Sequence, residues 1–181
     1  IIMENLHGIK RTLGSRQKAK KPILINDLKK IIKAIDEELI RAKTLIESKV
    51  KSQIKLRDKA LVLIGFAGGF RRSELVNIDY DDIEFVIEGV KILIKRSKTD
   101  QSGEGSIKAI PYFQNKEFCP VIALKDYIKY KFSDNREGKI FDISDKSVAL
   151  IIKRYAEKAG LDSTKYAGHS LRSGFATTAA E

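Results

Sequence analysis

The sequence has 181 residues, 43% of them hydrophobic, which is enough for a single domain with a buried core. Its longest uncharged apolar run, residues 60–70, is too short to cross a membrane, and one cysteine with two histidines excludes an internal disulfide and leaves too few ligands for a zinc cluster. The net charge of +11 is concentrated in residues 1–60, where 16 basic residues face 7 acidic ones, and this excess favours a polyanionic partner such as nucleic acid.

The chain begins with a basic segment that lacks a helical pattern. Residues 8–21 hold six basic residues, two glycines and no acidic residue, without an apolar face. We therefore predict an extended arm over residues 1–22, ended by Pro22, and a main domain over residues 23–181. The arm would bind the phosphates of double-stranded DNA through its basic side chains, namely Lys10, Arg11, Arg16, Lys18, Lys20 and Lys21.

Two helices are expected next. Asn26 is a suitable N-cap, and apolar residues recur at helical spacing from Leu28 to Ile46, which predicts an amphipathic helix with a core-facing stripe. The apolar run that ends at residue 67 predicts a buried helix over residues 58–67. A charged stretch over residues 49–59 is expected to separate the two helices.

The stretch over residues 68–75, Gly-Gly-Phe-Arg-Arg-Ser-Glu-Leu, carries the strongest local signal in the chain. Two glycines permit a tight reversal, and a short helix then begins with Arg71 in its first turn, where a guanidinium is well placed to bind a phosphate. Arg71 and Arg72 lie about 100° apart on a helix, so only one of them faces such a site. Glu74 shares the face of Arg71 and can hold it. Taken alone, the stretch is equally compatible with a pair of surface arginines.

The second half of the chain mixes strand and helix patterns. Short alternating runs bounded by turn residues predict three strands, at residues 83–86, 90–95 and 106–111. Lys98 then lies on the loop between the second and third strands. Apolar periodicity with Pro or Gly at the ends predicts three further helices, at residues 120–131, 145–159 and 169–180. The predicted fold class is mixed α+β, mostly helical, with a small three-stranded antiparallel sheet.

A second pair of basic residues lies near the end of the chain. His169 and Arg172 are three residues apart, so on a helix they would share one face. Aimed at the same point as Arg71, they would complete a cationic clamp that stabilises charge on a pentavalent phosphorus without a metal or other cofactor. Each residue alone has a simpler interpretation, which is a structural histidine for His169 and a salt bridge for Arg172.

Together, three segments resemble the tyrosine recombinases, the family of phage-type integrases. Residues 69–75 look like the first arginine box of this family, Gly-x-Arg-x-Ser-Glu-Leu. Residues 97–99, Ser-Lys-Thr, before a strand that ends in Ile-Pro, look like its catalytic lysine hairpin. Residues 169–172, His-Ser-Leu-Arg, are similar to its His-x-x-Arg box. The resemblance covers residues 8–181 and implies an integrase-type catalytic domain, with the basic arm as the end of a core-binding region.

The resemblance also implies a reaction and a role for each residue. A tyrosine would attack a DNA phosphate, forming a 3′-phosphotyrosyl link and a free 5′ hydroxyl without metal or ATP. Arg71 and Arg172 would grip the non-bridging oxygens of the scissile phosphate, and Lys98 would protonate the departing 5′ oxygen. His169 would assist proton transfer and orient the phosphate, and Glu74 would give structural support.

The nucleophile of such a reaction is expected outside the 181 residues. In this family the tyrosine follows the His-x-x-Arg box, whereas all six tyrosines of the chain precede Arg172. We therefore expect a fragment that is incomplete at its C-terminus and inactive by itself, from a parent protein that continues past Glu181 and contains the tyrosine. By resemblance the parent would act as a homotetramer on DNA, whereas the fragment is expected to be monomeric.

The leading hypothesis is therefore a site-specific recombinase, such as the integrase of a phage or mobile element. Two alternatives stay open: a non-cleaving DNA-binding remnant of an integrase, and a type IB topoisomerase-like enzyme, which shares the chemistry. The first twenty residues are polar and basic, without the apolar segment of a signal peptide. We therefore expect a cytoplasmic, nucleoid-associated protein with no membrane partner.

Overall fold

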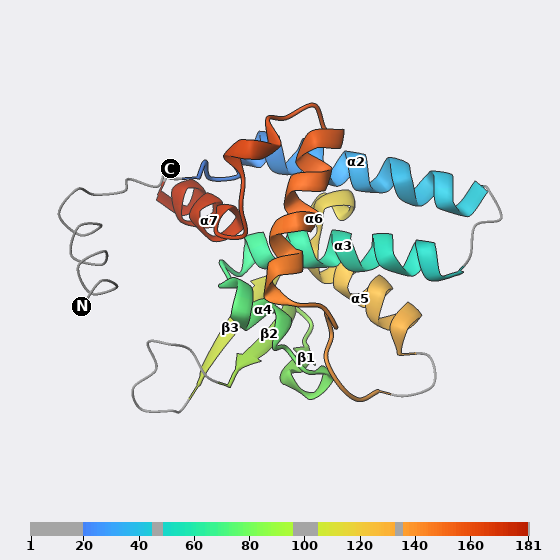
Figure 1. Ribbon diagram of the computed structural model, residues 1–181. Coiled ribbons are helices and arrows are strands. Elements are labelled where there is room, and N and C mark those ends of the chain that lie inside the picture. The colour runs from blue at the N-terminus through green and yellow to red at the C-terminus, as the bar shows by residue number, and fades with distance from the viewer. Residues whose placement is uncertain (1–19, 45–48, 96–104, 133–135, 181) are drawn as a thin grey trace, which may run out of the picture.

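The computed structural model describes residues 20–44, 49–95, 105–132 and 136–180 (Figure 1). Helices dominate and one small antiparallel sheet is present, so the expected mixed α+β class is confirmed. No helix in these ranges is both long and apolar enough to cross a bilayer. In chain order the elements are α2 (Ile25–Thr44), α3 (Lys49–Ala67), α4 (Arg72–Val76), η1 (Tyr80–Asp82), β1 (Ile83–Phe85), β2 (Gly89–Ile94), β3 (Ser106–Pro111), η2 (Lys116–Phe118), α5 (Pro120–Lys131), α6 (Asp145–Lys158), η3 (Ser163–Lys165) and α7 (Ser170–Ala180).

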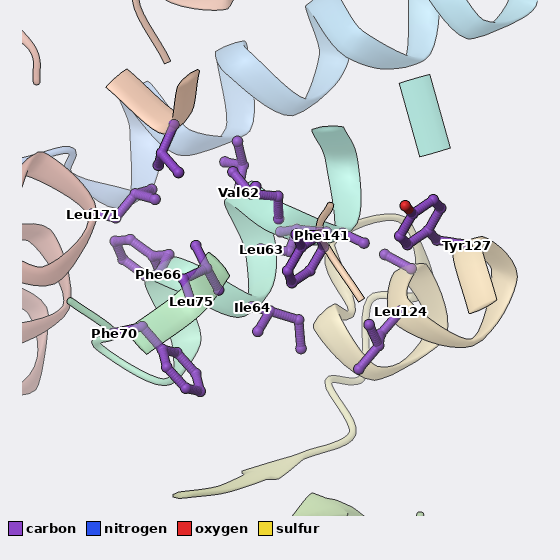
Figure 2. Close-up of a cluster of buried hydrophobic side chains, with 14 of the residues drawn as sticks. Val62, Leu63, Ile64, Phe66, Phe70, Leu75, Leu124, Tyr127, Phe141 and Leu171 are labelled. Carbon is purple, nitrogen blue, oxygen red and sulfur yellow. The ribbon is translucent and has the colours of Figure 1, made fainter. Parts of the chain in front are cut away.

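The second half of α3 forms the centre of the hydrophobic core. Residues 60–64, Ala-Leu-Val-Leu-Ile, are at most 2% exposed, so the helix is enclosed on all sides there. The helices α2, α5 and α7 pack around it (Figure 1). Figure 2 shows Leu63 and Ile64 of this helix among apolar side chains from other elements, such as Leu124 and Phe141. A helix that is apolar all round is stable only inside a core, which confirms the buried helix predicted from this run.

The charged stretch over residues 49–59 belongs to α3 and does not separate it from another helix, so that prediction was wrong. Two of its lysines pair with acidic residues across the contact between α3 and α2. The Nζ of Lys59 lies 2.8 Å from a carboxylate oxygen of Asp36, and Lys55 forms an ion pair with Glu38. These pairs satisfy the charges on a helical face that packs beside α2, and single-sequence periodicity does not detect a partner on another helix.

The sheet has the strand order β1-β2-β3 and lies beside α4, at the end of the helical core (Figure 1). In the register between β2 and β3, Val90 pairs with Ile110 and Ile92 pairs with Lys108. Val90, Ile92 and Ile110 are buried, so these positions define the inner face of the sheet. Directly paired residues share a face, and Lys108 therefore lies on the inner face as well. The three strands predicted from the sequence are confirmed.

Close backbone contacts hold α7 against the rest of the fold. The helix begins at Ser170, one residue later than predicted, because the carbonyl of His169 accepts a hydrogen bond from the Ser173 N–H at 3.0 Å as the first turn forms. The N–H of Ile23 donates to the Ser170 carbonyl at 2.9 Å. Gly174 faces the same segment, and a Cβ at this position would lie 2.0 Å from the Ile23 carbonyl oxygen. The close approach of α7 to this segment therefore depends on a glycine.

This contact makes Gly174 a test of how α7 is held. Gly174→Ala adds a methyl group against backbone, and we expect it to lower the free energy of unfolding by about 1–3 kcal/mol. The loss should appear although alanine improves helix propensity by about 1 kcal/mol. Urea unfolding of the 181-residue chain measures the change, with Ala176→Ser on an exposed position of α7 as the control. An unchanged or increased stability of Gly174→Ala would show that α7 does not approach this backbone closely.

Candidate functional site

The site is built on the reversal that ends α3, which we call the glycine turn (residues 68–69). The Gly69 φ angle is +55°, a left-handed conformation that favours glycine, and the Phe70 N–H returns to the Gly65 carbonyl at 3.2 Å. A Cβ on Gly69 would lie 2.6 Å from the ring of Phe175 on α7. The turn therefore lies directly against α7, and only two residues separate it from the start of α4.

Arg71 is the N-cap of α4, one residue before the position expected for it. Its N–H donates to one carboxylate oxygen of Glu74 at 2.8 Å, and its Nη1 donates to the other at 2.7 Å. The Glu74 side chain is only 5% exposed, whereas that of Arg71 is 30% exposed. The predicted pairing is thus confirmed: a buried carboxylate fixes the guanidinium while solvent can still reach it.

Arg172 approaches the same turn from α7. It lies in the first turn of that helix, and its Nη1 donates to the Gly69 carbonyl at 2.8 Å. The acceptor is two residues before Arg71, so the structure brings together the two arginines that the sequence analysis paired. Both guanidiniums are oriented by protein oxygens, and the planar N–H groups of a guanidinium suit an anion such as phosphate.

The structure adds a cation that the sequence analysis missed, Lys108 on β3. Its Nζ donates to the Gly68 carbonyl at 2.7 Å and lies 5.0 Å from the centre of the Phe70 ring. Burial lowers the pKa of its ammonium; Glu74 raises this pKa, and the positive charges of Arg172 and Arg71 lower it. The strand alternation could have predicted this position, because Lys108 is two residues from the buried Ile110 and so lies on the same face of β3.

His169 and Arg72 lie at the turn that leads into α7. His169 is exposed and lies one residue before α7, and a face shared by its side chain with Arg172 stays a prediction. Arg72 packs under the same turn, since a Cβ on Gly168 would lie 1.9 Å from the Arg72 Cδ. Arg72 Nε is buried and has no hydrogen-bond partner among the described residues. Arg71 and Arg72 therefore reach different surroundings, as their helical separation predicted.

The remaining candidates divide into two groups. Lys98 and four residues of the arm, namely Lys10, Arg11, Arg16 and Lys18, lie outside the described residues. Lys20 and Lys21 are described, and both bind protein groups. The Lys20 Nζ donates to the Thr164 carbonyl at 2.8 Å, and the Lys21 Nζ lies 3.0 Å from a carboxylate oxygen of Asp27. The last residues of the predicted arm are thus attached to the folded body.

The same carboxylate fixes Tyr166, the tyrosine nearest to His169 in the sequence. Tyr166 is buried, and its hydroxyl donates to Asp27 at 2.9 Å. Burial raises the pKa of this phenol, and the Asp27 carboxylate raises it further. The Tyr166 hydroxyl is therefore bound to Asp27 of α2 and not to the glycine turn. At the glycine turn lie three cations and the carboxylate of Glu74. Among the described residues there is no group of His, Cys, Asp and Glu that could hold a metal ion. The three cations at the turn suit the binding of an anion.

Comparison with known proteins shows the family to which the chain belongs. The model of the phage integrase family matches residues 21–181, and the chain belongs to that family. It is similar to an integrase/recombinase xerD homolog from Selenomonas ruminantium, with 43% identity over 193 residues that cover 100% of this chain and 52% of that protein. It is also similar to the tyrosine recombinase XerA of Pyrococcus horikoshii, with 30% identity over 139 residues that cover 75% of this chain and 46% of that protein.

Two solved structures share the fold. The XerH site-specific recombinase bound to its difH substrate in a pre-cleavage complex superposes with a TM-score of 0.61 and 19% identity, over 90% of this chain and 43% of that one. The XerA recombinase superposes with a TM-score of 0.62 and 20% identity, over 91% of this chain and 50% of that one. The chain thus spans about half the length of the curated relatives that it matches.

The contact of Asp27 with Lys21 and Tyr166 links α2 to the segment before His169, and its strength should depend on pH. Burial raises the pKa of Asp27, but the hydrogen bonds from Lys21 and Tyr166 lower it more, so it lies below its ordinary value of 3.8. A lowered carboxyl pKa stabilises the fold above pH 3.8, and this contribution is lost as the pH falls through the folded-state value.

We therefore expect Asp27→Asn to lower the free energy of unfolding at pH 7 by about 1–3 kcal/mol. The difference from the unmutated chain should shrink when the pH falls below 3.8, because the wild-type carboxylate then becomes protonated too. Urea unfolding at several pH values measures this difference, with Asp126→Asn at an exposed position of α5 as the control. A difference that stays constant down to the lowest pH would contradict the contact.

Proposed function

We propose that the full-length protein is a site-specific DNA recombinase that cleaves and rejoins strands through a 3′-phosphotyrosyl intermediate. The observation that carries this proposal is the convergence of Arg71 and Arg172 on one glycine turn, each with its guanidinium oriented by a protein oxygen. Membership of the phage integrase family supports it, as do the recombinase names of its relatives. The related XerH structure was solved with a DNA substrate, which supports double-stranded DNA as the partner of this protein as well.

In the proposed reaction, the two arginines bind the non-bridging oxygens of the scissile phosphate and stabilise the charge that grows on them. A tyrosine oxygen attacks phosphorus and the bond to the 5′ oxygen of the DNA breaks. Lys98 gives that oxygen its proton, and His169 accepts or returns the proton of the tyrosine. The reverse sequence, with a 5′ hydroxyl from the partner strand, rejoins the DNA. Because the energy of the phosphodiester bond is kept in the phosphotyrosyl link, rejoining needs no ATP. The two arginines stabilise the charge on the phosphate, so the proposed reaction uses no metal.

The nucleophile in this proposal is a tyrosine outside the 181 residues. Three tyrosines of the chain have buried hydroxyls that already donate elsewhere: Tyr127 to the Ile140 carbonyl at 3.0 Å, Tyr155 to Asp58 at 3.0 Å, and Tyr166 to Asp27 at 2.9 Å. Burial raises the pKa of Tyr127 to about 12 and also raises that of Tyr155, which makes both poor nucleophiles. These observations argue against those three tyrosines as the nucleophile, and with all six tyrosines preceding Arg172 we propose that the 181-residue chain alone does not cleave DNA.

The other expectations follow from the same proposal. The basic arm over residues 1–22 would run along backbone phosphates and join the catalytic domain, residues 23–181, to a core-binding region. Recombination joins four DNA ends, so the full-length protein would assemble as a homotetramer on DNA. A protein that recombines chromosomal or mobile-element DNA would work in the cytoplasm, at the nucleoid.

A covalent adduct tests the proposal directly. The full-length gene product is mixed with a nicked duplex that carries the ends of its element, so that the released strand diffuses away and the phosphotyrosyl link is trapped. Denaturing gels then measure the adduct for the unmutated protein and for Arg71→Ala and Arg172→Ala. We expect each substitution to slow adduct formation by about 100-fold or more, since each removes a donor to the transition-state oxygens.

The exposed Arg136, which follows α5, gives a matched control: Arg136→Ala removes one positive charge elsewhere and should leave the adduct rate almost unchanged. Failure of the unmutated protein to form an adduct, with salt-sensitive duplex binding intact, would favour a non-cleaving DNA-binding protein instead. Adduct formation that survives both arginine substitutions would contradict the clamp.

A further inference from the structure

Lys108 connects the sheet to the glycine turn. It projects from the inner face of β3, opposite Ile92, into the region where α3 ends. An inward lysine on a strand needs a polar partner, because an ammonium without one is costly to bury. The partner is the Gly68 carbonyl, and the ring of Phe70 provides a second, electrostatic contact with its face. Lys108 is thereby fixed by residues on both sides of Gly69.

Two successive carbonyls of the glycine turn accept hydrogen bonds from two cations. The Gly68 carbonyl accepts from Lys108 at 2.7 Å, and the Gly69 carbonyl accepts from Arg172 at 2.8 Å. Only two rotatable bonds, those of Gly69, separate these two carbonyl groups, and the ring of Phe175 packs against this residue. The direction of the second carbonyl therefore depends on how firmly the first one is held.

The charges at the turn also link the position of Lys108 to that of Arg172. Lys108 lies close enough to Arg71 and Arg172 that both influence its protonation, and Glu74 is the acidic group that offsets them. Mutual repulsion among these cations would push them apart unless each has a fixed acceptor. Glu74 is the acceptor for Arg71, and the two carbonyls of the turn are the acceptors for Lys108 and Arg172.

We propose that Lys108 is a positioning residue of the clamp: it fixes the Gly68 carbonyl, and through Gly69 this sets the direction in which Arg172 presents its guanidinium to the phosphate. The catalytic consequence rests on the function proposed above. The structural consequence does not, because it concerns only the orientation of Arg172 in the 181-residue chain.

The structural consequence is tested by nitrogen-15 NMR of arginine side chains in the 181-residue chain, with the signals of Arg172 assigned by Arg172→Lys. A guanidinium held by a carbonyl rotates slowly and gives separate signals for its two Nη groups. In Lys108→Met, which keeps the length of the side chain and removes its donors, we expect the Arg172 signals to merge. In Lys91→Met, on the outer face of the same sheet, they should stay separate. Lys108→Arg restores a donor and should keep them separate as well.

The catalytic consequence is tested in the full-length protein with the trapped adduct. We expect Lys108→Met to slow cleavage at saturating DNA by about tenfold to a hundredfold, as expected for a misplaced phosphate-binding group, and Lys108→Arg to recover most of the rate. Duplex affinity should change by less than about threefold, because many phosphate contacts contribute to it. Lys91→Met should match the unmutated protein in both measurements.

The outcomes separate the two proposals. If the unmutated protein forms no adduct, the proposed function fails, and the NMR result still decides the role of Lys108. Unchanged Arg172 signals in a folded Lys108→Met chain would overturn the positioning role, as would a normal cleavage rate. If Lys108→Met does not fold, Lys108→Leu, which also removes the donors, replaces it in both measurements and is held to the same outcomes.

Discussion

The site depends on the reversal of the backbone at the glycine turn. Its two carbonyls hold Lys108 and Arg172, while the chain that leaves the turn places Arg71 over the buried carboxylate of Glu74. The positive φ of Gly69 and the Phe175 ring against it leave no room for a side chain. A single two-residue reversal thus brings cations from a strand, a cap and a distant helix into one place.

The hydrophobic core makes that reversal rigid. The second half of α3 is enclosed by other helices, so the turn leaves the core at a fixed point (Figure 1). The helix α7 approaches its neighbours closely at two glycines. A Cβ on Gly65 of α3 would lie 2.9 Å from Leu171 of α7, and Gly174 of α7 leaves space for the carbonyl of Ile23. Packing rather than the arginines themselves therefore sets the separation of the segments that carry Arg71 and Arg172.

Much of this could be predicted from the sequence, because the strongest patterns are local. The apolar run at residues 60–67, the strand alternation and the spacing of Arg71 and Glu74 each depend on neighbours in the chain, and the structure confirms them. The charged half of α3 was misread because two of its lysines form ion pairs with another helix. Lys108 was overlooked since lysine usually marks an exposed position, and its acceptor lies 40 residues away in the sequence.

Arg71 and Arg172 are proposed to form a single phosphate site, and the proposed function depends on this most of all. The most direct measurement is a crystal structure of the full-length protein on a duplex that contains its cleavage site. We expect one backbone phosphate to lie between the two guanidiniums, within hydrogen-bond distance of both, with Arg71 still bound to Glu74 and Arg172 still beside Gly69. A DNA complex in which the scissile phosphate contacts neither arginine, or only one of them, would contradict the claim.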